Sequence, residues 1–201
     1  MKIAIEGMDG VGKSTIARKL ASDYNMIYLE KPLTGLFDTN VSNGKDVLRE
    51  VSNKIYSSKD EALKAWFFGL GNLYSFIEYE NEDVVIDRHF ASNYFWNGTQ
   101  RSNTIFKSMI ELIGVPDLTI VLTASIQSRM ERLYKRNPND YDLADMEKHV
   151  KGDDKMINFL REFNIPFVEV NTDNKNVDEV YEEVRNIVNE KRSVMRLVKK
   201  C

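Results

Sequence analysis

Short apolar runs alternate with longer amphipathic segments along most of the chain. Five runs are rich in β-branched residues and apolar at consecutive positions: Ile3–Ile5, Met26–Leu29, Val84–Ile86, Leu118–Leu122 and Phe167–Val170. Consecutive apolar residues are typical of strands that are buried on both faces, as in a parallel sheet. The pattern therefore predicts a five-stranded parallel sheet.

Between these runs, apolar residues recur at steps of three and four, as on one face of a helix. The clearest sets are Leu63, Trp66, Phe67, Leu70, Leu73, Tyr74 and Ile77, and Val177, Val180, Tyr181, Val184, Ile187 and Val188. We expect each set to be the buried stripe of a helix. Strand and helix in alternation predict a three-layer α/β domain with helices on both faces of the sheet. The polar segment 35–44 is interpreted as a surface loop.

Composition narrows the class of protein. The chain has 201 residues, enough for one domain with a sizeable core, and a formal net charge of −3. This charge gives no indication of a nucleic-acid or membrane partner. The single cysteine suits a reducing compartment, and the first apolar run is too short for a signal peptide or a spanning helix. We therefore expect a cytoplasmic protein.

Residues 7–15 read GMDGVGKST and fit the phosphate-binding pattern G-x-x-x-x-G-K-[ST]. The segment lies between a predicted strand, 2–6, and a predicted helix, as phosphate binding by such a loop requires. Backbone N–H groups of such a loop surround phosphate oxygens, its lysine reaches the β- and γ-phosphates, and its serine binds Mg²⁺. The residues predicted to bind ATP are Gly7, Asp9, Gly10, Val11, Gly12, Lys13, Ser14 and Thr15.

A second candidate site is the sequence VVIDRH, residues 84–89, in which a buried strand ends in Asp87 and Arg88. Ligands of open parallel sheets collect at the carboxyl ends of the strands. Asp87 would therefore lie near the phosphate loop and, with Ser14, is the predicted metal ligand. Arg88 is suited to bidentate binding of a phosphate. The alternatives are a local Asp–Arg ion pair and a helix cap by Asp87.

The segments IEGMDGVGKST and VIDRHFASNYFWNG together resemble the thymidylate kinase family. The resemblance implies a P-loop kinase fold over residues 1–201, with a short lid at about 136–146. It also implies transfer of the γ-phosphoryl group of ATP, with Mg²⁺, to a deoxynucleoside monophosphate, dTMP above all. A homodimer is implied by the resemblance alone.

The same resemblance implies an acceptor pocket. Asp9 would accept a hydrogen bond from the 3′-hydroxyl of the acceptor sugar, and Phe67 would pack on the base. Arg88, Ser92, Trp96 and Asn97 would surround the base and sugar. The large ring of Trp96 would exclude a ribose 2′-hydroxyl. For the two aromatic residues, packing in the core is the alternative.

Phosphoryl transfer needs more positive charge than one lysine supplies. Some family members carry an arginine within the phosphate loop, where this chain has Gly10. Arg129, Arg132 and Arg136 share one face of a predicted helix before the expected lid. The last two match the family pattern, so the predicted catalytic residues are Lys13, Asp87, Arg88, Arg132 and Arg136. A solvated basic face is the alternative.

Two departures from the family leave the acceptor open. The family's Arg-Glu-Pro after the second strand is replaced by Glu30-Lys31-Pro32, and the segment 67–73 lacks the family's arginine. A deoxynucleoside kinase, with Glu30 as general base toward a 5′-hydroxyl, is therefore an alternative. A regulator that binds a nucleotide without an acceptor is the alternative from another class.

Overall fold

The computed structural model describes residues 1–37, 43–139, 143 and 152–198. Its centre is a five-stranded sheet of order β2-β3-β1-β4-β5, in which every strand pair is parallel. The strands are β1 (Lys2–Glu6), β2 (Ile27–Glu30), β3 (Val84–Asp87), β4 (Leu118–Thr123) and β5 (Phe167–Asn171). The five strands expected from the apolar runs are thus confirmed.

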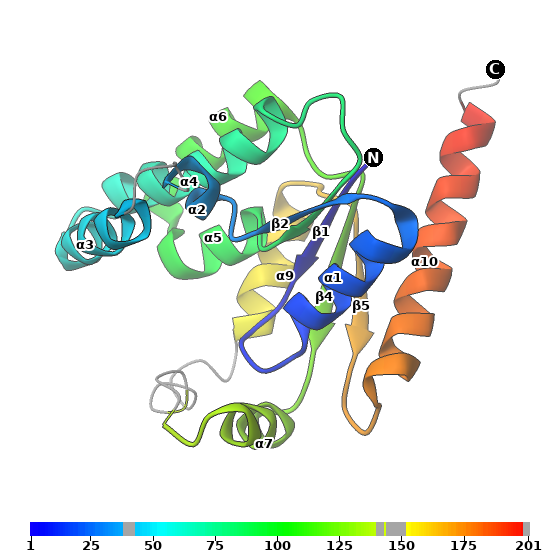
Figure 1. The fold of residues 1–201 in the computed structure, drawn as a ribbon. Coiled ribbons are helices and arrows are strands. Elements are labelled where there is room, and N and C mark those ends of the chain that lie inside the picture. Colours follow the sequence, from blue (N-terminus) through cyan, green and yellow to red (C-terminus); the bar gives the residue numbers. More distant parts are fainter. Residues whose placement is uncertain (38–42, 140–142, 144–151, 199–201) are drawn as a thin grey trace.

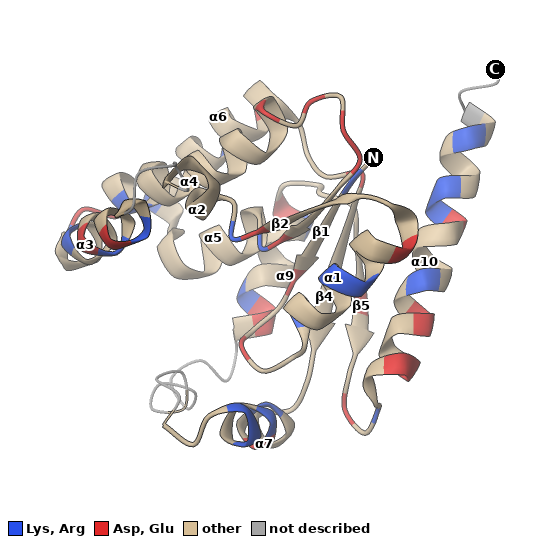
Figure 2. Cartoon of the chain, in the orientation of Figure 1, with Lys and Arg blue, Asp and Glu red and all other residues tan. Residues whose placement is uncertain are grey.

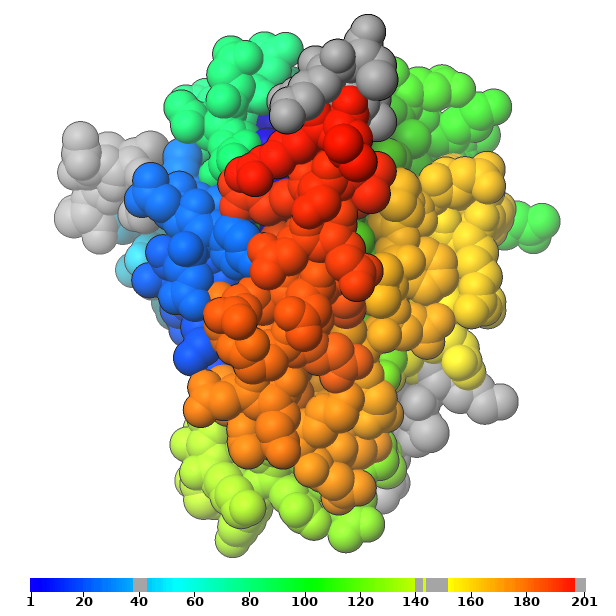
Figure 3. Space-filling view, turned by 90° about the vertical axis from the view of Figure 1, so that its right-hand side faces the viewer, coloured from blue at the N-terminus to red at the C-terminus, as the bar shows by residue number. Residues whose placement is uncertain are grey.

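Helices cover both faces of this sheet, so the three-layer prediction is confirmed (Figure 1). One face carries α1 (Lys13–Tyr24) and α10 (Val177–Val198), which lie side by side in Figure 3. The other carries α5 (Phe90–Asn97) and α9 (Gly152–Glu162), with α4 (Glu61–Ile77) and α6 (Asn103–Ile113) packed beyond them. The remaining elements are α2 (Leu33–Phe37), α3 (Gly44–Ser57), a 3₁₀ turn (Gln100–Ser102) and α7 (Ile126–Arg136).

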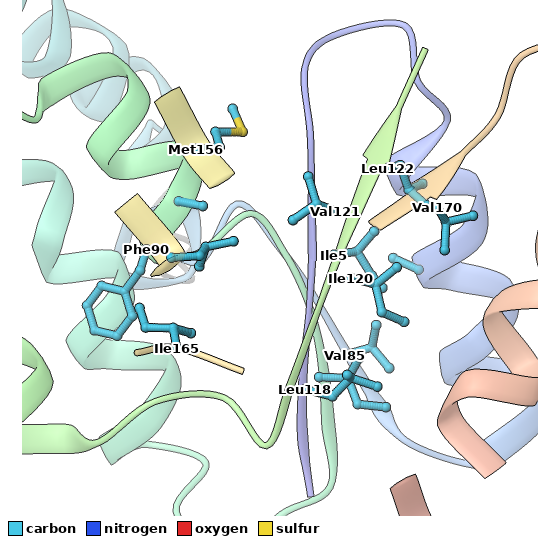
Figure 4. Close-up of a cluster of buried hydrophobic side chains, with 14 of the residues drawn as sticks. Ile5, Val85, Phe90, Leu118, Ile120, Val121, Leu122, Met156, Ile165 and Val170 are labelled. Atoms are coloured by element: carbon cyan, nitrogen blue, oxygen red, sulfur yellow. The ribbon is translucent and has the colours of Figure 1, made fainter. Parts of the chain in front are cut away.

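The core lies on both sides of the sheet (Figure 4). Phe90, Met156 and Ile165 fill the side of α5 and α9, and Ile120 and Val170 fill the side of α1 and α10. Because helices cover both faces of the sheet, its central strands contain few polar residues. The sheet also provides a rigid base for the loops at the carboxyl ends of its strands. Within the described residues, every helix is too short or too polar to cross a lipid bilayer.

The buried face of α4 differs from the predicted one. Leu63, Trp66, Leu70 and Ile77 are 46%, 46%, 42% and 63% exposed, and the buried residues are instead Ala65, Gly69, Gly71, Asn72, Ser75 and Phe76. Small side chains let neighbouring elements approach closely. A Cβ on Gly69 would lie 2.5 Å from the sulfur of Met109 in α6. In α10 the expected stripe is buried at Val180, Tyr181, Val184 and Val188, whereas Val177 is exposed.

Two loop predictions have mixed outcomes. The segment 35–44 was expected to be a loop, but its first three residues belong to α2 and its last begins α3. Residues 38–42 lie outside the described part of the chain. The expected lid, 136–146, begins at the end of α7, and all of it after residue 139 except residue 143 lies outside the described residues.

Candidate active site

The loop between β1 and α1 has the backbone geometry of an anion cradle. Gly12 adopts a φ of +98°, and a Cβ added there would meet nothing within 4 Å, so its backbone borders open space. Gly7 adopts a φ of +130° and packs so closely that a Cβ would lie 2.1 Å from the carbonyl oxygen of Leu122. Within the described residues, no side chain caps the start of α1. The N–H groups of its first turn are therefore available to an anion.

Lys13 is buried beneath this loop. It is 5% exposed, and its Nζ donates a hydrogen bond to the carbonyl oxygen of Met8 at 2.7 Å. Burial, with the neighbouring charge of Arg88, lowers the pKa of Lys13 to about 8. A phosphate group placed against this ammonium would supply the missing solvation.

Asp9 and Arg88 form an ion pair between the phosphate loop and the end of β3. Burial opposes ionisation of Asp9, but the charges of Arg88 and Lys13 outweigh it and hold the pKa of the carboxyl below its usual value. The Nζ of Lys13 lies 3.7 Å from the same carboxylate oxygen. Arg88 thus pairs with Asp9, across 79 positions of sequence, rather than with its neighbour Asp87.

Asp87 and Ser14 offer oxygen ligands for Mg²⁺. The Ser14 hydroxyl donates to Oδ2 of Asp87 at 2.5 Å, and the Tyr28 hydroxyl donates to the same oxygen at 3.2 Å. Oδ1 of Asp87 is buried and accepts no hydrogen bond from the described residues. This donor set fits Mg²⁺, which prefers oxygen and takes most of its ligands from water and phosphate. In the described part of the chain, no three His, Cys or acidic residues group into an all-protein metal site.

Glu6 is a site residue that the sequence reading missed. Its carboxylate accepts hydrogen bonds from the backbone N–H groups of His89 (2.9 Å), Ala91 (2.9 Å) and Ser92 (3.2 Å), and from the Ser92 hydroxyl. Burial raises the pKa of Glu6 above its usual value, although the hydrogen bonds from Ser92 and His89 act to lower it. Glu6 therefore anchors the start of α5 beside Arg88 and engages the hydroxyl of Ser92. The one signal in the sequence is a carboxylate at the end of an otherwise buried strand.

Two cavities meet at the carboxyl edge of the sheet. The first, of about 710 Å³, contains seven of the eight predicted ATP-binding residues, 9–15. Gly7 is not among the described residues that line it. The second, of about 400 Å³, lies among α2, α3, α4 and α5. Only three of the residues described as lining them, Asp9, Lys31 and Arg88, line both cavities. We name the first the donor cavity and the second the acceptor cavity, after the roles proposed for them below.

Five of the six residues predicted for the acceptor line this cavity: Asp9, Arg88, Ser92, Trp96 and Asn97. The sixth, Phe67, does not, and the ring that α4 contributes is Phe68. Phe68 stacks on Tyr56 with ring centroids 4.6 Å apart, and Phe67 packs edge-on behind Phe68 at 5.0 Å. The predicted ring is thus one position too early, about a quarter-turn around the helix.

Three buried asparagines contribute amides to the acceptor cavity. Asn97 Nδ2 donates to Asn93 Oδ1 at 3.0 Å, and Nδ2 of Asn93 has no partner among the described residues. Nδ2 of Asn72 and Oδ1 of Asn97 are buried and likewise have no partner in the part of the chain that the structure describes. Buried polar atoms without partners are costly, so these amides are suited to the edge of a base. Asn72 and Asn93 were missed in the sequence because both lie in apolar-looking helices.

Basic residues gather on α7 (Figure 2), and its three arginines have two kinds of surroundings. Arg132 and Arg136 line the donor cavity. Arg132 donates to the hydroxyl and the carbonyl oxygen of Thr172, at 2.8 and 2.6 Å. Arg129 is 2% exposed and donates from Nε to the carbonyl oxygen of Asp9 at 2.8 Å. Arg129 therefore supports the phosphate loop from below, and the other two face its ligand side.

Comparison with known proteins identifies the family. The family model described as thymidylate kinase matches residues 5–184. The chain is 28% identical over 202 residues to a probable thymidylate kinase of Methanococcus aeolicus, covering 96% of this chain and 98% of the relative. It is 29% identical over 203 residues to a probable thymidylate kinase of Archaeoglobus fulgidus, covering 94% of both chains.

Two solved structures share the fold. A deoxyadenosine kinase from M. mycoides, with products bound, superposes with a TM-score of 0.66 at 19% identity, covering 94% of this chain and all of that one. The thymidylate kinase from Ehrlichia chaffeensis superposes with a TM-score of 0.61 at 18% identity, covering 94% of this chain and 98% of that one. With the family match over nearly the whole chain, the protein belongs to the thymidylate kinase family of ATP-dependent nucleotide kinases.

Proposed function

We propose that this protein transfers the γ-phosphoryl group of ATP to a deoxynucleoside monophosphate, with dTMP as the first candidate. The observation that carries the proposal is the meeting of two cavities at Asp9, Lys31 and Arg88. One cavity surrounds the phosphate loop, and the other is lined by aromatic rings and unpartnered amides. The names of the relatives favour dTMP.

In this proposal, the loop residues 9–15 and Lys13 bind the triphosphate of ATP. Ser14 and Asp87 would hold Mg²⁺, which when bound neutralises charge on the phosphates. An oxygen of the acceptor phosphate attacks the γ-phosphorus, the bond to the bridging oxygen of the β-phosphate breaks, and ADP leaves. Arg88, Arg132 and Arg136 are proposed to balance the charge of the moving group. The acceptor phosphate is already ionised, so no strong base is required.

For the acceptor, Phe68 takes the place proposed for Phe67 against the base. Asp9 would accept from the 3′-hydroxyl, as the family resemblance implies. Trp96 and Asn97 remain the proposed contacts to base and sugar, whereas the Ser92 hydroxyl is already engaged by Glu6. Asn72 and Asn93 join this set because their Nδ2 atoms find no partner among the residues that the structure describes.

The deoxynucleoside kinase alternative is weakened by Glu30. Arg18 Nη2 lies 3.1 Å from a carboxylate oxygen of Glu30, and Glu30 lines the donor cavity but not the acceptor cavity. A general base must reach the hydroxyl from which it takes the proton. Glu30 is therefore poorly placed for that role.

The proposal is tested by following ADP release from ATP·Mg²⁺ with one acceptor at a time: dTMP, the other deoxynucleoside monophosphates, or thymidine. We expect dTMP to stimulate release most, and a Lys13→Ala variant to lose the stimulation. Stimulation by thymidine and not by dTMP would support a nucleoside kinase. ATP binding without stimulation by any acceptor would support a regulator.

We further propose a homodimer located in the cytoplasm. The apolar stripe Leu63, Trp66, Leu70 and Ile77 lies on one face of α4 and is about half exposed. Exposed apolar stripes of this kind are commonly protein interfaces. A second copy of the chain is the proposed occupant.

A further inference from the structure

We propose that Arg129 is a positioning residue for phosphoryl transfer, which fixes the Asp9–Gly10 peptide so that the Gly10 N–H faces the phosphates of ATP. The inference rests on the proposed function and deepens it, because it names a residue that prepares the phosphate loop for its ligand. It starts from a buried arginine of α7 that lies outside the family pattern and contacts the loop.

Helix α7 packs directly against the phosphate loop at Gly10 (Figure 1). A Cβ added to Gly10 would lie 2.8 Å from the carbonyl oxygen of Arg129 and 3.0 Å from its Cα. Gly10 also adopts a φ of +86°, a conformation that residues with a side chain rarely take. The backbone of α7 therefore occupies the space of a side chain at this position, where some family members carry an arginine.

The side chain of Arg129 fixes one peptide of the loop. It is 2% exposed, and its Nε donates to the carbonyl oxygen of Asp9 at 2.8 Å. The C=O and N–H of a trans peptide point in opposite directions, so the N–H of Gly10 points away from Arg129. Gly10 is among the described residues that line the donor cavity and Arg129 is not. This N–H is therefore directed toward the place of the phosphates.

The two neighbouring carbonyl groups of the loop are also engaged by cations. Lys13 Nζ donates to the carbonyl oxygen of Met8 at 2.7 Å, and Arg132 Nη1 approaches that of Gly10 at 3.5 Å. A carbonyl oxygen turned toward the phosphates would repel them, whereas an N–H stabilises them. Lys13 and Arg132 line the donor cavity and so face the ligand as well. We therefore assign to Arg129 the role of holding the loop itself.

Asp153, in the first turn of α9, acts on the buried charge of Arg129. Burial lowers the pKa of Arg129, whereas the negative charges of Asp153 and Asp9 act to raise it. Helix α9 reaches the loop as well, since a Cβ on Gly152 would lie 2.4 Å from the sulfur of Met8. Oδ1 of Asp153 is buried and accepts no hydrogen bond from the described residues. The phosphate loop is thus held between α7 and α9, with an arginine on one helix and an aspartate on the other.

The test separates the hydrogen bond of Arg129 from its charge. Arg129→Gln keeps an N–H donor at the place of Nε without the charge, and Arg129→Met keeps the length of the side chain without a donor. Titration calorimetry measures binding of a non-hydrolysable ATP analogue with Mg²⁺ and, separately, of dTMP. We expect Arg129→Met to bind the ATP analogue about tenfold more weakly or worse, and Arg129→Gln to stay within about threefold of wild type.

The control measurements show that the effect is local to the donor cavity. Binding of dTMP should change less than about threefold in both variants, because the peptide held by Arg129 faces the triphosphate. Lys135→Met is the matched control on α7, since Lys135 is exposed and is not among the described residues that line the donor cavity. It should bind the ATP analogue as the wild type does.

A second measurement follows the peptide itself in the wild-type protein. Asp9–Gly10 is the only Asp–Gly pair in the sequence, so ¹³C at the aspartate carbonyl and ¹⁵N on glycine select one NMR signal for this peptide. This signal should shift when the ATP analogue is added. In free Arg129→Met it should already lie away from its wild-type position, and in free Arg129→Gln it should lie closer to it.

Thermal unfolding of each variant verifies that it is folded. Wild-type affinity for the ATP analogue in Arg129→Met, or equal losses in Arg129→Met and Arg129→Gln, would overturn the inference, as would a Gly10 signal that the analogue leaves unmoved. Because the readouts are binding and an N–H signal, they are separate from turnover. The expected results in a protein that releases no ADP with any acceptor would support the role of Arg129 and contradict the proposed reaction.

Discussion

Arg88 and Asp9 form an ion pair that joins the end of β3 to the phosphate loop. Arg88 holds this position with a φ of +77°, a conformation that costs energy for a residue with a side chain. The pair lines both cavities, so one contact links the donor loop to the acceptor pocket. Glu6 fixes the adjacent backbone from the other side. The site is therefore built as one unit from β1, β3 and the loops that follow them.

The pKa of Lys13 predicts how ATP binding depends on pH. In the free protein this pKa is about 8, and bound phosphates must raise it because they stabilise the ammonium. At a pH between the pKa of Lys13 in the free protein and its pKa in the ATP complex, the complex carries more protons than the free protein. The affinity for ATP should therefore fall as pH rises above 8, by up to about tenfold per pH unit. Titration calorimetry at pH 8.5 in two buffers of different ionisation enthalpy should detect proton uptake.

Lys13→Arg is the control for this pH dependence, because arginine stays protonated throughout the range. Its remaining affinity should vary little between pH 7.5 and pH 9.5. An equal pH dependence in both proteins would assign the effect to another group.

Removing the charge of Glu6 should loosen the start of α5. In Glu6→Gln one carboxylate oxygen becomes an N–H₂ group facing backbone donors, and we expect a loss of about 1–3 kcal/mol in the free energy of unfolding. The KM for the acceptor should rise more than the KM for ATP, since α5 lines the acceptor cavity. Urea unfolding and steady-state kinetics measure the two effects. Ser92→Ala, which removes one of the four bonds, should cost less.

Arg136 should act on turnover more than on binding. It lines the donor cavity at the end of α7, beside the segment expected to be the lid. We expect Arg136→Ala to lower kcat about 100-fold or more while the Kd for ATP changes about threefold at most. The neighbouring Lys135→Ala, on the same turn but outside the cavity lining, should be close to wild type. Unchanged turnover in Arg136→Ala would remove this residue from the proposed catalytic set.

The exposed face of α4 predicts the oligomeric state. If it joins two copies, Trp66→Glu should convert a dimer to a monomer, because a buried unpaired charge is strongly unfavourable at an interface. Light scattering after size-exclusion chromatography measures the mass directly. Val194→Glu on α10, at a position 57% exposed, is the control and should leave the mass unchanged. A monomeric wild type would contradict the dimer.

Sequence patterns predicted those parts of the protein whose structure is decided by residues close together in the sequence. The five strands, the phosphate loop and the Asp87–Arg88 corner follow from short runs whose buried character or backbone chemistry is evident in the sequence. The face of α4 could not be predicted, because close packing on Gly69 and Gly71 outweighed burial of its large side chains.

The missed site residues depend on long-range contacts. Glu6 finds its hydrogen-bond partners more than 80 positions away, and no local pattern indicates such a pairing. Phe68 replaces Phe67 because helix rotation, set by tertiary packing, decides which of two adjacent rings lines the cavity. Lys31 was missed because it joins the site through the pairing of β2 with β3, which places it beside Arg88.

The central claim is that a phosphoryl group passes between two cavities that meet at Asp9, Lys31 and Arg88. Its most direct test is to supply ATP labelled at the γ-phosphate together with dTMP and Mg²⁺, and to separate the products. We predict that the label appears in dTDP, with one ADP formed for each dTDP. Label found only in inorganic phosphate, or transferred to thymidine but not to dTMP, would contradict the account.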